Sequence, residues 1–215
     1  MAEAPELRLQ LRLHLVTDSA LCGARGVEAV VAAAVRGGAT CVQLREKTLD
    51  TRPFVERARA LKALLKPLRI PLLINDRLDV ALASEADGLH VGQSDMAAED
   101  VRRLWPRALI GLSIENLSQL KNAERLPVDY YGISPVFGTA TKADTAPALG
   151  LAGLRAIRAG TTRPLIAIGG IGFDNAAAVI DAGADGLAVV SLLCAAPDPA
   201  EAARRLRLAM EARCP

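Results

Sequence analysis

Short apolar segments rich in Val, Leu and Ile alternate along the chain with longer segments whose apolar positions repeat at helical spacing. The short segments predict strands at 13–16, 41–44, 72–74, 88–91, 109–112, 130–133, 165–168 and 186–190. The longer segments predict helices at 26–35, 51–65, 78–84, 98–104, 117–125, 150–158, 174–182 and 199–210. Continuous apolar strands separated by helices are typical of a parallel sheet that is covered by helices.

The number of strand and helix units indicates whether the sheet is open or closes into a barrel. Eight units in one chain favour a closed barrel, and no G-x-G-x-x-G motif follows the first strand to suggest a dinucleotide-binding sheet. A weak internal repeat supports this organisation, because segments 38–42, 86–89, 128–131 and 183–187 all join a helix to a strand. The chain has 215 residues and no linker-like stretch. We therefore predict an α/β fold, a single (β/α)8 TIM barrel over residues 1–215.

Composition narrows the class of protein. The net charge is +2, and most basic residues are Arg on predicted helices, without the dense basic stripe of a nucleic-acid-binding protein. No stretch near the start is apolar enough for a signal peptide or a membrane span. We expect a cytoplasmic protein with small-molecule substrates and with neither nucleic acid nor membrane as a partner. A homo-oligomer is left open.

Polar residues follow almost every predicted strand. In chain order they are Gln43, Arg45, Glu46 and Lys47, then Asn75 and Asp76, then Gln93 and Asp95, then Ser113, Ser134, the run 138–142, the pair Gly169 and Gly170, and Ser191. In (β/α)8 barrels the active site lies where the strands end, so these residues should meet at one rim. Their charges are of both signs, which predicts that these residues form an active site and do not serve only to stabilise the fold.

Asp76 and Asp95 follow adjacent strands. A few carboxylates, completed by substrate phosphates, are the usual protein ligands of Mg²⁺. Each Asp also precedes a predicted helix and could instead cap it. Two neighbouring carboxylates repel each other unless a cation or a shared proton offsets the repulsion. The pair therefore favours a Mg²⁺ site.

Basic residues and glycines at the same rim suit phosphate groups. Arg45, Lys47 and Lys142 would supply positive charge, Arg as a two-pronged clamp and Lys as a point charge. Gly170 and Ser191 occupy the positions of the common phosphate site of these barrels, although the glycines could serve only to turn the chain. The loop 137–149 is long enough to close over a substrate, or it is a passive surface loop.

Read in order, these motifs resemble the thiamine-phosphate synthase family. The matching stretches are 42–47 (VQLREK), 74–76 (IND), 87–95 (DGLHVGQSD), 111–113 (GLS), 132–137 (GISPVF), 139–142 (TATK), 167–171 (AIGGI), 183–186 (GADG) and 190–191 (VS). They cover nearly the whole chain.

The resemblance implies an enzyme that joins a pyrimidine methyl diphosphate to a thiazole phosphate with Mg²⁺. It implies that the pyrimidine diphosphate is held by Gln43, Leu44, Arg45, Glu46, Lys47, Asn75, Ser113 and Lys142. It assigns Mg²⁺ to Asp76 and Asp95, and the thiazole phosphate to Thr139, Ala140, Thr141, Gly170, Val190 and Ser191. The residues expected to act in catalysis are Arg45, Lys47, Ser113 and Lys142.

The chain departs from the family pattern at two positions. His14 stands where many relatives carry Tyr, so the resemblance implies that contacts to the pyrimidine differ here, and Glu115 stands where many carry His. Related thiazole tautomerases depend on a His in the latter region and lack the full diphosphate and metal set, so a tautomerase is less favoured. A non-catalytic barrel that binds a phosphorylated ligand and a different phosphate-handling barrel are also compatible with the fold. We expect His14 and His90 to be structural residues with satisfied hydrogen bonds.

Overall fold

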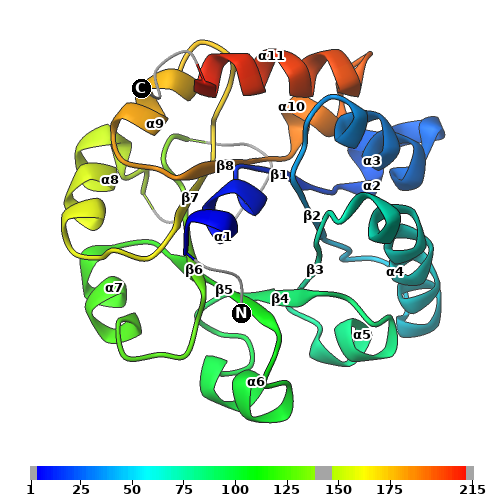
Figure 1. The fold of residues 1–215 in the computed structure, drawn as a ribbon, viewed down its shortest axis with the longest axis horizontal. Helices are drawn as coiled ribbons and strands as arrows, with labels where there is room; N and C mark the ends of the chain where they lie inside the picture. Colours follow the sequence, from blue (N-terminus) through cyan, green and yellow to red (C-terminus); the bar gives the residue numbers. More distant parts are fainter. Residues whose placement is uncertain (1–3, 139–146, 212–215) are drawn as a thin grey trace.

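The computed structural model of the protein describes residues 4–138 and 147–211. Eight parallel strands form a closed barrel in chain order, so the predicted (β/α)8 fold is confirmed (Figure 1). The strands are β1 Leu13–Val16, β2 Cys41–Leu44, β3 Leu72–Asn75, β4 Gly88–Val91, β5 Leu109–Ile114, β6 Tyr130–Ile133, β7 Leu165–Ile168 and β8 Gly186–Val189. Each strand pairs with its neighbour in the sequence, and β1 pairs with β8 to close the ring.

Helices surround the barrel as an outer ring (Figure 1). They are α3 Val27–Arg36, α4 Thr51–Leu65, α5 Leu78–Ala83, α6 Ala98–Leu104, α7 Leu117–Ala123, α8 Gly150–Ala159, α9 Ala176–Asp181 and α11 Pro199–Glu211. Two short helices, α2 Ser19–Cys22 and α10 Ser191–Cys194, follow β1 and β8, and single 3₁₀ turns lie at Gly23–Arg25 and Lys66–Leu68. A further helix, α1 Ala4–Gln10, precedes the first strand. The sequence pattern did not predict α1, α2 or α10.

The strands bury side chains on both faces, which explains their continuous apolar runs. On β1, Leu13 and Leu15 pack in the layer between sheet and helices, whereas His14 and Val16 face the inside of the barrel. A separate cluster fills one half of the interior with Cys41, Leu73, Tyr130 and Ile166, and with Leu11 and Leu7 from the chain start. Helix α1 lies over the centre of the ring in Figure 1 and closes this N-terminal end. Open space is therefore left at the opposite end, where the strands finish.

A repeated polar contact holds the N-terminal end of the barrel together. One residue before β4, β6 and β8, an Asp carboxylate accepts a hydrogen bond from an N–H at the start of the preceding strand. The pairs are Asp87 with Leu72 at 2.8 Å, Asp129 with Ile110 at 2.7 Å and Asp185 with Leu165 at 2.8 Å. Each Asp also pairs with a basic residue on the helix that comes before that preceding strand, namely Lys62 of α4, Arg102 of α6 and Arg158 of α8. Before β2, Thr40 Oγ1 accepts from the Leu13 N–H at 2.8 Å. These contacts are the structural basis of the internal repeat in the sequence.

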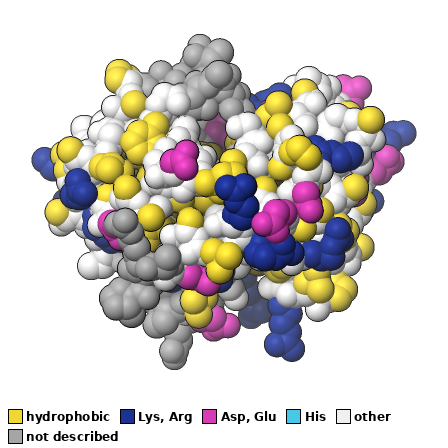
Figure 2. Space-filling view, turned by 90° about the horizontal axis from the view of Figure 1, so that it is seen from above, with side chains coloured by type: hydrophobic (Ala, Val, Ile, Leu, Met, Phe, Trp, Pro, Cys, Tyr) yellow, Lys and Arg dark blue, Asp and Glu magenta, His cyan; other side chains and the backbone are white. Residues whose placement is uncertain are grey.

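The surface mixes charges of both signs. Figure 2 shows Lys and Arg side chains beside Asp and Glu side chains, with hydrophobic side chains scattered between them. On α11 such neighbours form the pairs Arg204–Glu201 and Arg207–Glu211, one helical turn apart. Within the described ranges, every helix is too short or too polar to cross a membrane.

Candidate active site

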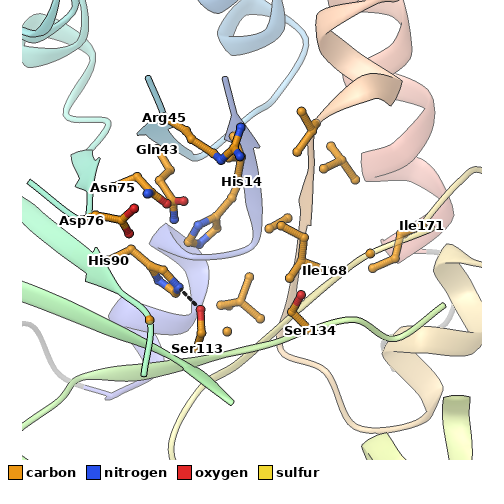
Figure 3. A pocket seen from close by; sticks show the side chains of 18 of the residues that line it. His14, Gln43, Arg45, Asn75, Asp76, His90, Ser113, Ser134, Ile168 and Ile171 are labelled. Carbon is orange, nitrogen blue, oxygen red and sulfur yellow. Dashed lines mark hydrogen bonds between the residues drawn. The ribbon is translucent and has the colours of Figure 1, made fainter. Parts of the chain in front are cut away.

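A cavity of about 590 Å³ opens where the strands end. Every strand, together with the segment that follows it, contributes to its lining. Figure 3 shows Arg45, Asn75 and Asp76 on one side of the cavity, with Ile168 and Ile171 on the other. The volume lies in the range of small-molecule sites, and the two walls differ in chemistry. The charged wall comes from β2–β4, and the more apolar wall comes from β7.

The backbone at the end of β3 adopts an uncommon conformation. Asp76 has a φ of 64°, in the left-handed region that Asp enters more readily than most residues other than Gly. Its N–H donates to the His90 carbonyl at 2.9 Å, which ties the turn to β4. The carboxylate accepts a hydrogen bond from Lys47 Nζ at 2.7 Å. On β2's side of the same wall, Arg45 Nη1 lies 3.8 Å from Asp18 Oδ2. Asp76, Lys47 and Arg45 all line the cavity.

Asp95 lies beside Asp76, as expected for residues that follow adjacent strands. Its Oδ2 accepts the Gly92 N–H at 2.7 Å. Burial, and after it the neighbouring Asp76 carboxylate, raises the pKa of Asp95 above its usual range. A cation between the two groups would relieve this repulsion.

The carboxylate pair suits a metal that brings its own remaining ligands. Among the residues that the structure describes, no three or more His, Cys, Asp or Glu side chains gather as a metal site. Asp76 and Asp95 alone would leave most of an octahedral shell to water and to substrate oxygens. Mg²⁺ is commonly held in this way, with one or two carboxylates and substrate phosphates. The donor set therefore fits Mg²⁺ in the presence of a phosphorylated substrate.

Hydrogen bonds connect the mouth of the cavity to its floor. Ser113 Oγ lies 2.9 Å from His90 Nε2, and His90 Nδ1 lies 2.8 Å from the Tyr130 hydroxyl. The Ser113 carbonyl accepts from Gln93 Nε2 at 2.6 Å. Burial raises the pKa of Tyr130 well above its usual range, so the phenol stays neutral. Ser113 is therefore held by two hydrogen bonds, one between its hydroxyl and His90 and one from Gln93 to its carbonyl.

Two glycines make room for this chain of hydrogen bonds. A Cβ on Gly111 of β5 would lie 2.1 Å from Tyr130 Cζ and 2.5 Å from His90 Nδ1. A Cβ on Gly132 of β6 would lie 2.8 Å from His90 Cε1. The rings of His90 and Tyr130 therefore occupy space that side chains on the neighbouring strands would otherwise fill.

The opposite wall contains the predicted phosphate residues. Gly170 has a φ of 61°, and a Cβ there would lie 2.6 Å from the Gly138 carbonyl, so only glycine fits this turn. Its own carbonyl accepts from Asn175 Nδ2 at 2.9 Å. Val190 and Ser191, at the start of α10, line the cavity beside it.

The structure brings most of the predicted site residues to this cavity. They are Gln43, Arg45, Lys47, Asn75, Asp76, Asp95, Ser113, Gly170, Val190 and Ser191. Leu44 is not among them, since its side chain is fully buried in the core between sheet and helices. Thr139, Ala140, Thr141 and Lys142 lie outside the described residues.

Glu46 also faces away from the cavity. Its carboxylate accepts from Arg57 Nη1 at 2.7 Å and from Ser19 Oγ at 2.6 Å, and the backbone N–H of Lys47 donates to it at 3.0 Å. Burial raises the pKa of Glu46, but hydrogen bonds from Ser19, Thr48 and Lys47 outweigh it, so the pKa lies below its usual range. Glu46 thus holds the loop that carries Arg45 and Lys47.

The sequence analysis did not place Tyr130 or His14 in the site, yet both line the cavity from inward-facing positions on β6 and β1. Ser134, which the sequence analysis placed at the rim, lines the cavity just after β6. His90 is hydrogen-bonded as expected. For His14 the expectation was wrong, because its Nε2 is buried and has no hydrogen-bond partner among the described residues. Strand alternation within 13–16 and 130–134 was the signal that could have identified these residues.

Together, the fold and the cavity define a class of protein. A (β/α)8 barrel with polar and charged side chains gathered at the C-terminal ends of its strands is an enzyme scaffold, and this site suits a small anionic substrate.

Comparisons with known proteins identify the family. The profile described as thiamine monophosphate synthase matches residues 13–193. The thiamine-phosphate synthase of Albidiferax ferrireducens is 59% identical over 97% of this chain and 96% of its own length. That of Chloroflexus aurantiacus is 52% identical over 91% of each chain. A solved structure of the Pyrococcus furiosus thiamine phosphate pyrophosphorylase matches with a TM-score of 0.89 at 37% identity, covering 96% of this chain and 98% of that one.

The chain belongs to the thiamine monophosphate synthase family. It is a transferase of thiamine biosynthesis that acts on small-molecule substrates. The resemblance found in the sequence is confirmed, and the tautomerase and binding-protein hypotheses are not favoured.

Proposed function

We propose that the protein condenses 4-amino-2-methyl-5-(diphosphooxymethyl)pyrimidine with 4-methyl-5-(2-phosphooxyethyl)thiazole, forming thiamine phosphate and diphosphate, with Mg²⁺ as cofactor. One observation carries the proposal beyond family membership. Arg45, Lys47 and the pair Asp76 and Asp95 share one wall of one cavity, across from Gly170 and Ser191. Such a site offers two places for phosphate groups, as this pair of substrates requires.

The charged wall would receive the diphosphate. The aminopyrimidine ring can delocalise positive charge onto its methylene, so departure of the diphosphate can run ahead of attack. Arg45 and Lys47 would stabilise the negative charge that builds on the leaving group, since preorganised charges in a cavity act most strongly there. Asn75 and Ser113 would hydrogen-bond the diphosphate or the ring beside it. Asp76 and Asp95 would hold Mg²⁺, which would act as a Lewis acid and neutralise part of the same charge.

The opposite wall would hold the nucleophile. Gly170, Val190 and Ser191 would bind the thiazole phosphate and so direct the thiazole nitrogen at the methylene across the cavity. The attacking nitrogen carries no proton, so the reaction requires no general base. On the strength of the resemblance alone, residues 139–141 would add to the thiazole phosphate site, and Lys142 would add to the diphosphate site.

One assay tests the proposal. Mixing both substrates with the protein and Mg²⁺ should yield thiamine phosphate and diphosphate in equal amounts, and excess chelator should stop both. Arg45→Ala or Lys142→Ala should lower kcat by about 10²- to 10³-fold, the usual effect of removing one preorganised contact. Arg103→Ala is the matched control, because that side chain is exposed on α6 and pairs with Asp100 one turn earlier on the same helix.

Three results would contradict parts of the proposal. Normal turnover by an Arg45→Ala or Lys142→Ala variant would remove that residue from the proposed site. Activity that persists in excess chelator would rule out the metal, whereas an Asp76→Ala variant that keeps normal activity and Mg²⁺ dependence would remove Asp76 from the metal site. Conversion of a thiazole substrate without any release of diphosphate from the pyrimidine would point to an isomerase instead.

A further inference from the structure

The floor of the cavity contains a ring nitrogen that lacks a hydrogen-bond partner. His14 on β1 is 1% exposed, and its Nε2 is buried without a partner among the residues the structure describes. The residue lines the cavity, and Figure 3 shows its ring directed inward, near Gln43 and opposite His90. Most buried polar groups in proteins are hydrogen-bonded, so an unmet nitrogen at a cavity wall points to a partner supplied by a ligand or by water.

The protonation of His14 follows from its other nitrogen. The Leu11 backbone acts on the ring as a hydrogen-bond acceptor, and because Nε2 has no partner among the described residues, we assign this contact to Nδ1. A carbonyl can only accept, so the proton resides on Nδ1 and Nε2 presents a lone pair. Burial, and after it the nearby His90, lowers the pKa of His14 to about 3. The ring is therefore neutral throughout the physiological range, and Nε2 is a pure acceptor.

The surroundings of His14 fit a flat ring. The Tyr130 ring meets His14 edge-on, with centroids 5.6 Å apart and planes at 62°. Ile166 and Ile168 provide apolar surface on the far side of the floor, and the nearly buried Gln43 offers an amide donor and an amide acceptor. A heteroaromatic ring that carries an N–H donor next to a ring acceptor would match these groups.

Only one of the two proposed substrates has this chemistry. The pyrimidine carries an exocyclic amine, which donates, beside a ring nitrogen, which accepts. The thiazole phosphate carries no N–H at all. The lone pair of His14 can therefore be met by the pyrimidine and not by the thiazole, and this places the pyrimidine on the floor beneath the charged wall.

We propose that His14 determines specificity for the amino-substituted pyrimidine, with Nε2 accepting a hydrogen bond from the exocyclic amine. The inference rests on the function proposed above. In a 4-oxo analogue the oxygen would face His14 Nε2, so two hydrogen-bond acceptors would meet. A buried mismatch of this kind strongly lowers the affinity for the analogue.

The test compares the 4-amino pyrimidine diphosphate with its 4-oxo analogue. Dissociation constants for both are measured by calorimetry with Mg²⁺ and without thiazole, and kcat/KM is measured for the amino substrate. The wild-type protein should bind the amino compound at least about 10-fold more tightly, and His14→Phe should lose about 10- to 100-fold in affinity for it while the ratio falls toward one. His14→Gln, which keeps a carbonyl acceptor, should retain part of the preference.

Two controls separate recognition from packing. Ile166→Val alters the same floor without a polar group and should leave the ratio of dissociation constants unchanged. The KM for the thiazole phosphate should also stay within about twofold in His14→Phe, because that substrate has no donor for Nε2.

The outcomes are distinct. If the wild-type protein binds the amino and oxo compounds with nearly equal dissociation constants, the assignment is wrong, and the hydrogen-bond partner of Nε2 is water. A folded His14→Phe variant that keeps the wild-type ratio also overturns it, while turnover of the amino substrate leaves the proposed function intact. If the wild-type protein releases no diphosphate from the amino substrate in the presence of the thiazole phosphate, the proposed function fails, and this inference fails with it.

Discussion

Gly111→Ala tests the packing beneath the site most directly. The added methyl group would lie 2.1 Å from Tyr130 Cζ, 2.4 Å from its hydroxyl and 2.5 Å from His90 Nδ1. Carbon atoms pack at about 3.5–4.0 Å, so the Tyr130 ring would have to move by about 1.4 Å or more. It cannot do so freely, since it is 1% exposed and bonded to His90.

The expected cost follows from this confinement. Inserting one methyl group into a well-packed interior destabilises a protein by about 1–3 kcal/mol, and a rigid neighbour places the effect near the upper end. For a chain of this size, about 3 kcal/mol corresponds to a fall in Tm of roughly 6 to 12 °C. Ser113 would lose its fixed partner as His90 shifts, so kcat/KM should also fall.

Thermal and urea unfolding without substrates measure the stability change, and the coupled assay measures kcat/KM. Gly172→Ala is the matched control, since nothing lies within 4 Å of its added Cβ, and it should change the stability by less than about 0.5 kcal/mol. Adding Tyr130→Val to Gly111→Ala should give a protein more stable than the sum of the single effects, by about 1 kcal/mol or more. A Gly111→Ala protein whose Tm stays within about 2 °C of the wild-type value would refute the reasoning.

Three further predictions concern other parts of the barrel. Asp129→Ala removes the carboxylate that pairs with Arg102 and leaves the Ile110 N–H without its partner, so it should lower the free energy of unfolding by about 1–3 kcal/mol in urea titrations, with kcat/KM nearly unchanged. Gly170→Ala should raise the KM for the thiazole phosphate at least about tenfold and leave that for the pyrimidine unaltered, because its Cβ would displace the loop at Gly138. The pKa of Glu46 is lower in the folded protein than in the unfolded chain, where a Glu titrates at about pH 4.3, so ionised Glu46 stabilises the fold above that pH. This contribution is lost as the pH falls through the lowered pKa of the folded state. Stability curves between about pH 6 and pH 3 should therefore fall less steeply for Glu46→Gln than for the wild type.

The strands were predictable because both faces of a parallel barrel are buried. Their limits agree with the sequence pattern to within two residues. The largest difference is β5, which continues through Ser113 to Ile114. A polar side chain looks like the end of a strand in the sequence, but at the mouth of a barrel a strand can point such a residue into the cavity. Helices α2 and α10 have four residues each, too few to establish a helical period.

The contiguous motif after β2 shows the limit of prediction for the site. Successive residues of an extended chain point to opposite sides. Gln43, Arg45 and Lys47 therefore face the cavity, whereas Leu44 and Glu46 between them face the helices and Arg57. A sequence motif includes all five residues without distinction, so it does not say which of their side chains face the cavity. His14 illustrates the same limit, because its position within an apolar strand does not by itself say whether its ring faces the cavity or the helices.

The two ends of the barrel differ in how completely their polar groups are satisfied, and this difference identifies the functional end. At the N-terminal end, Asp87, Asp129 and Asp185 each have a strand N–H and a basic side chain as partners, which stabilises the fold. At the other end, Asp95 lies in the field of a second carboxylate, and His14 Nε2 has no hydrogen-bond partner within residues 4–138 and 147–211. Both arrangements lower the stability of the free protein, so folding alone does not explain them. A cation at the carboxylates and an amine at His14 would relieve both at once, so binding of the substrate with Mg²⁺ would recover the free energy that the free protein lacks.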